Sequence, residues 1–130
     1  MKRGIVFGLV AIVVLLFGSL AMAGVSAPCL SAPTTFICPT DDVGVNFSWD
    51  VLTGANKYSI DVVVTSLDGL TIVEQTFSTN TNSLSVPFTD FLICGDAVAK
   101  VKGLNPPGGQ TKCSQSNPFS SECDFTVPCP

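Results

Sequence analysis

The segment from Val45 to Thr65, VNFSWDVLTGANKYSIDVVVT, constrains the fold more than any other part of the chain. In each half of this segment, apolar and polar residues alternate along the sequence. The apolar members are Val45, Phe47 and Trp49 in the first half, and Tyr58, Ile60, Val62 and Val64 in the second. Alternation with a period of two indicates strands that bury one face. Residues 53–56 between the halves have turn chemistry, so the segment predicts a β-hairpin.

Further segments between residues 34 and 127 show the same alternation. Asp68-Gly69 is a hairpin turn signal between two of them, because this pair suits the positive φ of a tight turn. No segment of residues 24–130 has the period of a helix. The sequence therefore predicts an all-β domain. Its expected strands are 34–38, 44–50, 57–65, 70–77, 84–88, 96–104 and 119–127.

The first 23 residues have the pattern of a secretory signal peptide. Lys2 and Arg3 precede an apolar run from Ile5 to Leu20, and Ala21-Met22-Ala23 is an A-x-A cleavage signal. A retained transmembrane anchor is the alternative, but the apolar run is short for a membrane span. We expect residues 1–23 to be removed. Residues 24–130 then form one secreted or extracytoplasmic domain that no longer inserts into the membrane.

The charge of residues 24–130 bears on which partners this domain can bind. Four lysines face ten acidic residues, which gives a net charge of −6. Nucleic acids and anionic membrane surfaces attract basic proteins, so neither is an expected partner. The negative charge favours solubility.

All six cysteines of the chain follow residue 23. An even number of cysteines in an exported chain indicates up to three disulfides, for which fifteen connectivities can be drawn. Zinc binding is the alternative, but the sequence has no C-x2-C pair and no histidine. We expect disulfides, with no metal and no cofactor. The cysteines are Cys29, Cys38, Cys94, Cys113, Cys123 and Cys129.

The residues that could support catalysis are few. Without histidine, neither a Ser-His-Asp nor a Cys-His arrangement can form. A pair of carboxylates could hydrolyse a glycoside, but most acidic residues fall in turns or at outward strand positions. Asp41-Asp42 lacks the D-x-D-x-D pattern of a calcium loop. We expect these carboxylates to face water, and we expect no enzymatic activity.

Two motifs resemble fibronectin type III domains, over roughly residues 30 to 128. The first is similar to strands B and C of that family, where Trp and Tyr are core landmarks: Phe47-x-Trp49-x5-Ala55-x2-Tyr58-x-Ile60-x-Val62. The second is similar to strand F and the F–G turn: Val98-x2-Val101-x3-Asn105-x2-Gly108. One departure is that the family usually has Tyr where this chain reads Ile93-Cys94-Gly95-Asp96-Ala97. The resemblance implies a seven-stranded β-sandwich, here stapled by disulfides.

The geometry of such a sandwich favours one pairing of the six cysteines. It places the start of the first strand beside the F–G turn, and the A–B turn beside the end of the chain. The last pair then joins strands F and G. The favoured pairs are Cys29–Cys113, Cys38–Cys129 and Cys94–Cys123.

The resemblance implies a non-enzymatic binding or adhesion module at the cell surface, with a protein or glycan partner. Recognition in such domains is usually carried by loops on a rigid scaffold. We expect the binding loops to lie at one end, in segments 51–56 and 105–110, with the polar run 78–83 as a further candidate. The loop residues of interest are Thr53, Asn56, Asn105, Pro106, Pro107 and Gly108.

Two other functions stay open. The domain could be a structural subunit of an extracellular assembly that adds a strand at the edge of segment 70–77 or of the first strand. It could also be a secreted protease inhibitor that presents the Pro-rich loop 105–109. The sequence does not set the oligomeric state.

Overall fold

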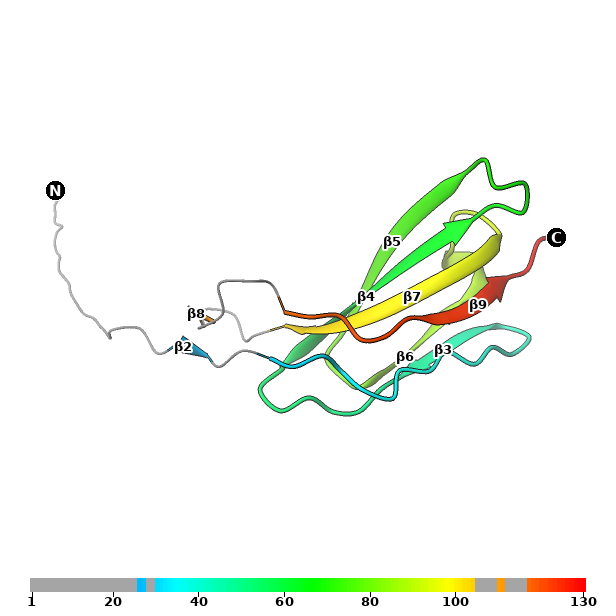
Figure 1. Cartoon of the computed structure of the whole chain (residues 1–130). Helices are drawn as coiled ribbons and strands as arrows, with labels where there is room; N and C mark the ends of the chain where they lie inside the picture. Colours follow the sequence, from blue (N-terminus) through cyan, green and yellow to red (C-terminus); the bar gives the residue numbers. More distant parts are fainter. Residues whose placement is uncertain (1–25, 28–29, 105–109, 112–116) are drawn as a thin grey trace, which may run out of the picture.

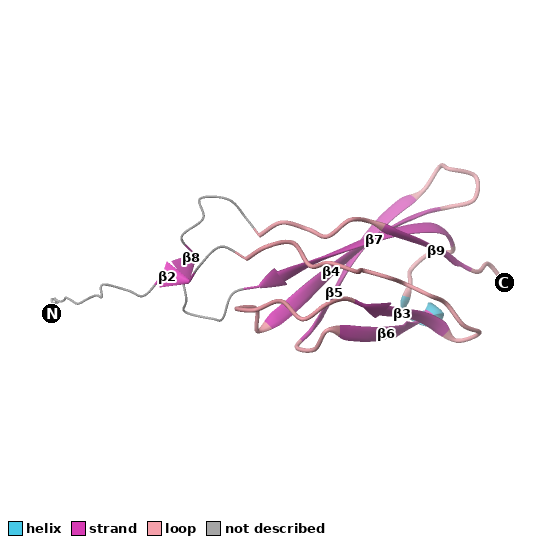
Figure 2. Ribbon diagram, turned by 60° about the horizontal axis from the view of Figure 1, so that its bottom comes forward, coloured by secondary structure: helices cyan, strands magenta, loops and turns pink. Residues whose placement is uncertain are grey.

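The alternating segments form the strands of two antiparallel sheets, which Figures 1 and 2 show as two layers. The structure is a computed structural model that describes residues 26–27, 30–104, 110–111 and 117–130. One sheet pairs β3 (Gly44–Ser48) with β6 (Ser83–Pro87). The other has four strands in the order β5-β4-β7-β9. Its strands are β4 (Lys57–Thr65), β5 (Ile72–Thr79), β7 (Gly95–Leu104) and β9 (Cys123–Val127).

The two halves of segment 45–65 are strands, as predicted, but they do not form a hairpin. β3 pairs with β6, whereas β4 lies between β5 and β7 in the opposite sheet. Their aromatic faces meet across the interior, where the rings of Trp49 and Tyr58 pack edge to face with centroids 5.2 Å apart. The predicted hairpin is therefore wrong, because the apolar faces are buried against each other and not side by side.

The predicted first strand runs beside β3 as an interrupted segment. Isolated bridges join Ile37 to Ser48 and Thr40 to Val45. Between them the Asn46 N–H donates to the carbonyl oxygen of Pro39 at 2.8 Å. Pro39 has no N–H to return the bond, so a continuous ladder cannot form there.

Residues from both sheets fill the interior. The exposed fraction of Val45, Ile60, Val62 and Val101 is 0%, and burial of a side chain of this size contributes about 1.5–3 kcal/mol. The predicted inward positions of β7 are confirmed, since its small and branched residues are buried in alternation with half-exposed ones. An aromatic network crosses between the sheets. Its members are Phe36, Phe47, Trp49, Tyr58, Phe77, Phe91 and Phe125.

The last strand begins at Cys123 and not at Phe119, and Phe119 does not face the core. Its ring lies beneath the ammonium groups of Lys100 and Lys102, which are 4.4 and 4.9 Å from the ring centroid. The alternation is broken at Ser120. Its N–H donates to the carbonyl oxygen of Val101, and its hydroxyl accepts from the Val101 N–H. The Ser120 hydroxyl thus takes the place of a backbone carbonyl oxygen as the acceptor for Val101. The side chains before Ser120 therefore no longer point in the directions that strict alternation predicts.

Three short elements complete the described chain. η3 (Phe88–Asp90) follows Pro87, so Phe88 lies in a 3₁₀ turn and not in the predicted strand 84–88. β2 (Ser26–Ala27) pairs in parallel with β8 (Gln110–Thr111). No helix within the described ranges is long and apolar enough to cross a membrane.

Two disulfides among the described residues brace the sandwich, and their pairing differs from the prediction. The bonds are Cys38–Cys123 and Cys94–Cys129, with Cα atoms 6.2 and 5.1 Å apart. The predicted pairs Cys38–Cys129 and Cys94–Cys123 are therefore wrong. The register explains why: Gly95 pairs with Val127, and Ala99 pairs with Cys123.

Cys94 consequently adjoins the end of β9, near Cys129. Ala99, which pairs with Cys123, lies five residues after Cys94. Five residues of an extended strand span about 16 Å. A disulfide requires Cα atoms closer than about 7 Å. The third predicted pair, Cys29–Cys113, lies outside the described residues.

Candidate functional site

The strand registers gather the connections of the sandwich at two ends (Figure 1). At one end lie the β3–β4 loop (residues 49–56), the β5–β6 loop (80–82) and the end of β7. We call this the loop end. At the other lie the turn before β3 (41–43), the β4–β5 turn (66–71), the segment 88–94 and residues 128–130. We call this the hairpin end.

The β3–β4 loop, which was predicted to bind a partner, is held in one shape by a buried tyrosine. The hydroxyl of Tyr58 accepts a hydrogen bond from the Leu52 N–H at 2.9 Å. A tight turn follows, closed by the Ala55 N–H donating to the Leu52 carbonyl oxygen, with Gly54 at a φ of 95°. Thr53 and Asn56 are both exposed. The loop thus presents its polar residues on a fixed backbone.

The polar run 78–83 reaches the same end of the molecule. Asn82 and Trp49 exchange two hydrogen bonds, from the Trp49 N–H to the Asn82 carbonyl oxygen and from Asn82 Nδ2 to the Trp49 carbonyl oxygen. The structure therefore brings this run beside the β3–β4 loop. Asn105, Pro106, Pro107 and Gly108 lie outside the described residues, as does the loop of the proposed inhibitor.

The β4–β5 turn at the hairpin end is fixed by side chains. Asp68 Oδ1 accepts hydrogen bonds from the Ser66 hydroxyl at 2.6 Å and from the Leu70 N–H at 2.9 Å, and these bonds lower the pKa of Asp68. The Ser66 hydroxyl also accepts from the Thr71 N–H. This network leaves Leu67 and Leu70 in solvent. This surface was not predicted from the sequence, although two leucines in a polar turn were a signal for it.

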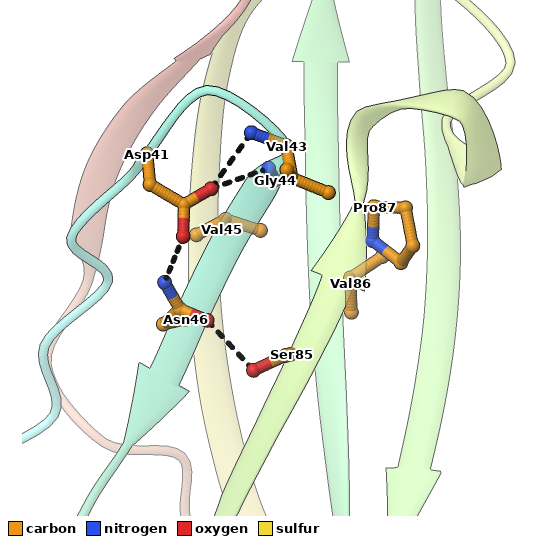
Figure 3. Close-up of a pocket in the computed structure, with 8 residues that line it drawn as sticks. All are labelled: Asp41, Val43, Gly44, Val45, Asn46, Ser85, Val86 and Pro87. Atoms are coloured by element: carbon orange, nitrogen blue, oxygen red, sulfur yellow. Dashed lines mark hydrogen bonds between the residues drawn. The ribbon is translucent and has the colours of Figure 1, made fainter.

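A shallow pocket lies at the edge of the hairpin end, on the outer face of the β3–β6 sheet (Figure 3). Asp41 accepts hydrogen bonds from the Gly44 N–H, the Val43 N–H and Asn46 Nδ2, and these bonds lower the pKa of Asp41. Asn46 Oδ1 accepts from the Ser85 hydroxyl. The polar groups of this pocket are bonded to one another, so their role is to shape the turn.

Comparison with known proteins identifies the architecture. No protein-family model matches the sequence, and no curated protein matches it. Among solved structures, the fn3 domain of the human collagen alpha-1(XX) chain matches with a TM-score of 0.50 at 16% identity, over 78% of this chain and 86% of that one. The chain has the fibronectin type III fold. This confirms the fold that the two sequence motifs resemble.

Two further fibronectin type III structures are similar at a lower level. They are FN3tt, with a TM-score of 0.46 at 18% identity, and FN3tt mut, with a TM-score of 0.45 at 16% identity. Each match covers 75% of this chain, and 92% and 96% of FN3tt and FN3tt mut.

The corner before β7 of this fibronectin type III sandwich is built differently from the family pattern. Where the family usually has Tyr, Cys94 forms its disulfide with Cys129. Gly95 follows with a φ of 147°, and a Cβ atom there would collide with the carbonyl oxygen of Thr65. The disulfide and the glycine together let the chain enter β7 close against the end of β4.

The acidic side chains of this domain face solvent, as predicted. Among the ten acidic residues, nine are exposed and Asp61 is half-buried. No group of three or more His, Cys, Asp or Glu side chains within the described ranges could hold a metal ion. The candidate sites are therefore the surfaces at the two ends of the sandwich.

Proposed function

We propose that this fibronectin type III domain is a non-enzymatic binding or adhesion module, secreted or held at the cell surface. The observation that carries the proposal is the pair of disulfides, which join the first segment and the C-terminal residues to the sheets. Disulfides persist in oxidising compartments outside the cytoplasm. The signal-peptide pattern of residues 1–23 supports the same location.

The proposed binding function is supported by exposed loops whose backbone is already ordered. A loop that is already ordered loses little conformational entropy when it binds. The β3–β4 loop meets this condition, because Tyr58 and the turn at Gly54 fix its backbone. We therefore place recognition of a protein or glycan at Thr53 and Asn56, together with the predicted loop residues 105–108.

Capture with the oxidised domain tests this function. Residues 24–130 are immobilised and exposed to the extracellular material of the source cells, and a retained partner is identified and purified. A double change, Thr53→Ala with Asn56→Ala, should weaken its binding by about tenfold or more. Thr89→Ala, at an exposed threonine of the hairpin end, is the matched control. Failure to retain any extracellular partner would contradict the function, and equal binding by both variants would move the site away from this loop.

A second candidate, the structural subunit, is supported by the edge strand β5. Its eight residues lie at the border of the four-stranded sheet and include a single charge, Glu74, with no proline or glycine. Natural edge strands usually carry charges, prolines or bulges that prevent further pairing. Size-exclusion chromatography over a range of concentrations tests strand addition. Oligomers that Ser78→Lys on β5 abolishes, and Thr126→Lys on β9 leaves intact, would favour this function.

A further inference from the structure

Apolar side chains are unevenly exposed on this domain. Seven large apolar residues of the described chain stand in solvent, and five of them lie at the hairpin end. Leu70 is 85% exposed and Leu92 is 73% exposed. The five residues are Val43, Leu67, Leu70, Ile72 and Leu92. The loop end, where binding was predicted, has Val51 alone.

Leu70, the most exposed of the five, lies with Leu67 and Ile72 on an ordered backbone. Leu67 and Leu70 flank Asp68 and Gly69 in the β4–β5 turn, where the Asp68 carboxylate accepts from the Leu70 N–H and the Ser66 hydroxyl accepts from the N–H of the next residue. Ile72 opens β5 and lies opposite Thr65 in the ladder. Because the turn is ordered before any contact is made, these side chains can be buried at small entropic cost.

Charge is segregated along the same axis. The half of the sandwich nearer the hairpin end has seven carboxylates and no described lysine. The half nearer the loop end has three carboxylates, Asp50, Asp61 and Glu122, and all three described lysines, Lys57, Lys100 and Lys102. The carboxylates of the hairpin half are Asp41, Asp42, Asp68, Glu74, Asp90, Asp96 and Asp124. The described part of the chain is therefore strongly negative in one half and balanced in the other.

We propose that the hairpin end docks a polypeptide partner whose contact surface is apolar and basic, with Leu67 and Leu70 as the anchors. This proposal rests on the proposed binding function and assigns it a second surface. Charge complementarity selects the partner: the surrounding carboxylates attract lysine and arginine and repel an anionic membrane. A second copy of this chain fits less well, because the described residues of its loop half, with three lysines and three carboxylates, have no excess of positive charge.

A synthetic peptide of alternating leucine and lysine serves as the probe, with binding to the oxidised domain measured by fluorescence anisotropy. We expect Leu67→Ser and Leu70→Ser each to weaken binding by about tenfold, and added salt to weaken it further. Val51→Ser, which removes an equally exposed apolar side chain at the loop end, should bind like the wild type. Asp96→Asn should weaken binding severalfold. A peptide of alternating leucine and glutamate should not bind.

Three outcomes would overturn the proposal. The first is that Val51→Ser weakens binding of the leucine–lysine peptide as much as Leu70→Ser does. The second is binding to phosphatidylserine vesicles that is lost in Leu70→Ser, which would make the surface a lipid site. The third is self-association that the same change abolishes, which would make the partner a second copy. If any of these occurs while capture of an extracellular partner still depends on Thr53 and Asn56, the docking proposal fails and the proposed function stands.

Discussion

Gly95 shows how a single residue sets the path of the chain between the sheets. Its φ of 147° lies in a region that side chains rarely adopt, and an added Cβ would meet the Thr65 carbonyl oxygen. Gly95→Ala should therefore lower the free energy of unfolding by about 1–3 kcal/mol from the backbone conformation alone, with a further loss from the collision. Urea unfolding measures the total.

Gly69→Ala is the matched control for this change. Gly69 also has a positive φ, of 76°, but no atom lies within 4 Å of the added Cβ. It should show the conformational loss without the steric one. Equal losses for the two variants would contradict the close approach of β7 to β4.

Asp41 makes the stability of the turn before β3 depend on pH. Hydrogen bonds from the Gly44 N–H, the Val43 N–H and Asn46 hold its pKa below the ordinary value of 3.8. A carboxyl with a lowered folded pKa stabilises the fold above its unfolded pKa, and this contribution is lost as the pH falls through the folded pKa. Asp41→Ala should thus be less stable than the wild type at neutral pH, and the difference should shrink as the pH falls below about 4.

The neighbouring Asp42 provides the comparison for this pH profile. It is exposed, and within the described chain its side chain makes no hydrogen bond. Asp42→Ala should leave the stability close to that of the wild type. Thermal unfolding at a series of pH values compares the three proteins. A constant difference between Asp41→Ala and wild type down to pH 2 would contradict this role.

Strands could be predicted from the sequence where one face is buried along the whole element. In residues 57–65 every second position is apolar from Tyr58 to Val64, and β4 has those bounds. The prediction failed where a backbone or side-chain bond interrupts the pattern, at Pro39 beside β3 and at Ser120 before β9. The alternation of apolar and polar residues indicates which face of a strand is buried. It does not indicate where a proline or a side chain interrupts the backbone hydrogen bonds between strands.

Contacts between distant residues were harder to predict than elements. The cysteine pairing depends on the register of β7 against β9, in which Cys94 lies five residues from Ala99, the residue that pairs with Cys123. Of the candidate site, the sequence indicated the β3–β4 loop by its turn residues. It did not reveal the apolar hairpin end, because the grouping of Leu70 with Leu92 arises from the sheet topology.

Removing the two disulfides in turn tests this register at the level of elements. Non-reducing peptide mapping should find Cys38 joined to Cys123 and Cys94 joined to Cys129. The bonds span 85 and 35 residues, and the entropic stabilisation grows with the logarithm of that span. The loss should be about 4.6 kcal/mol for Cys38→Ala with Cys123→Ala and about 3.8 kcal/mol for Cys94→Ala with Cys129→Ala. A larger loss from the second pair would contradict the entropic argument, and peptides linking Cys38 to Cys129 would contradict the register.

The stability of the whole molecule depends on its buried core and on the two disulfides of its described residues. Its surface is strongly negative in one half, and repulsion among those carboxylates opposes the compact state. The total stability of a domain is about 5–15 kcal/mol, so two disulfides at about 4.6 and about 3.8 kcal/mol are a large share of it. The domain should therefore depend on an oxidising environment for its folded state.

Reduction of the whole domain tests that dependence, with its single tryptophan as the probe. Trp49 is 3% exposed and packs against Tyr58 and Phe36, so unfolding must transfer its indole to water and shift its emission to longer wavelength. With a reductant present, the thermal midpoint should fall by at least about 10 °C, because each kcal/mol moves it by about 4–8 °C in a domain of this size. A control variant lacks both described disulfides, because alanine replaces Cys38, Cys94, Cys123 and Cys129. It separates the loss of the disulfides from any other action of the reductant. If the reduced protein kept the midpoint of the oxidised one, the core alone would suffice, and the case for a domain built for the extracellular environment would lose its main support.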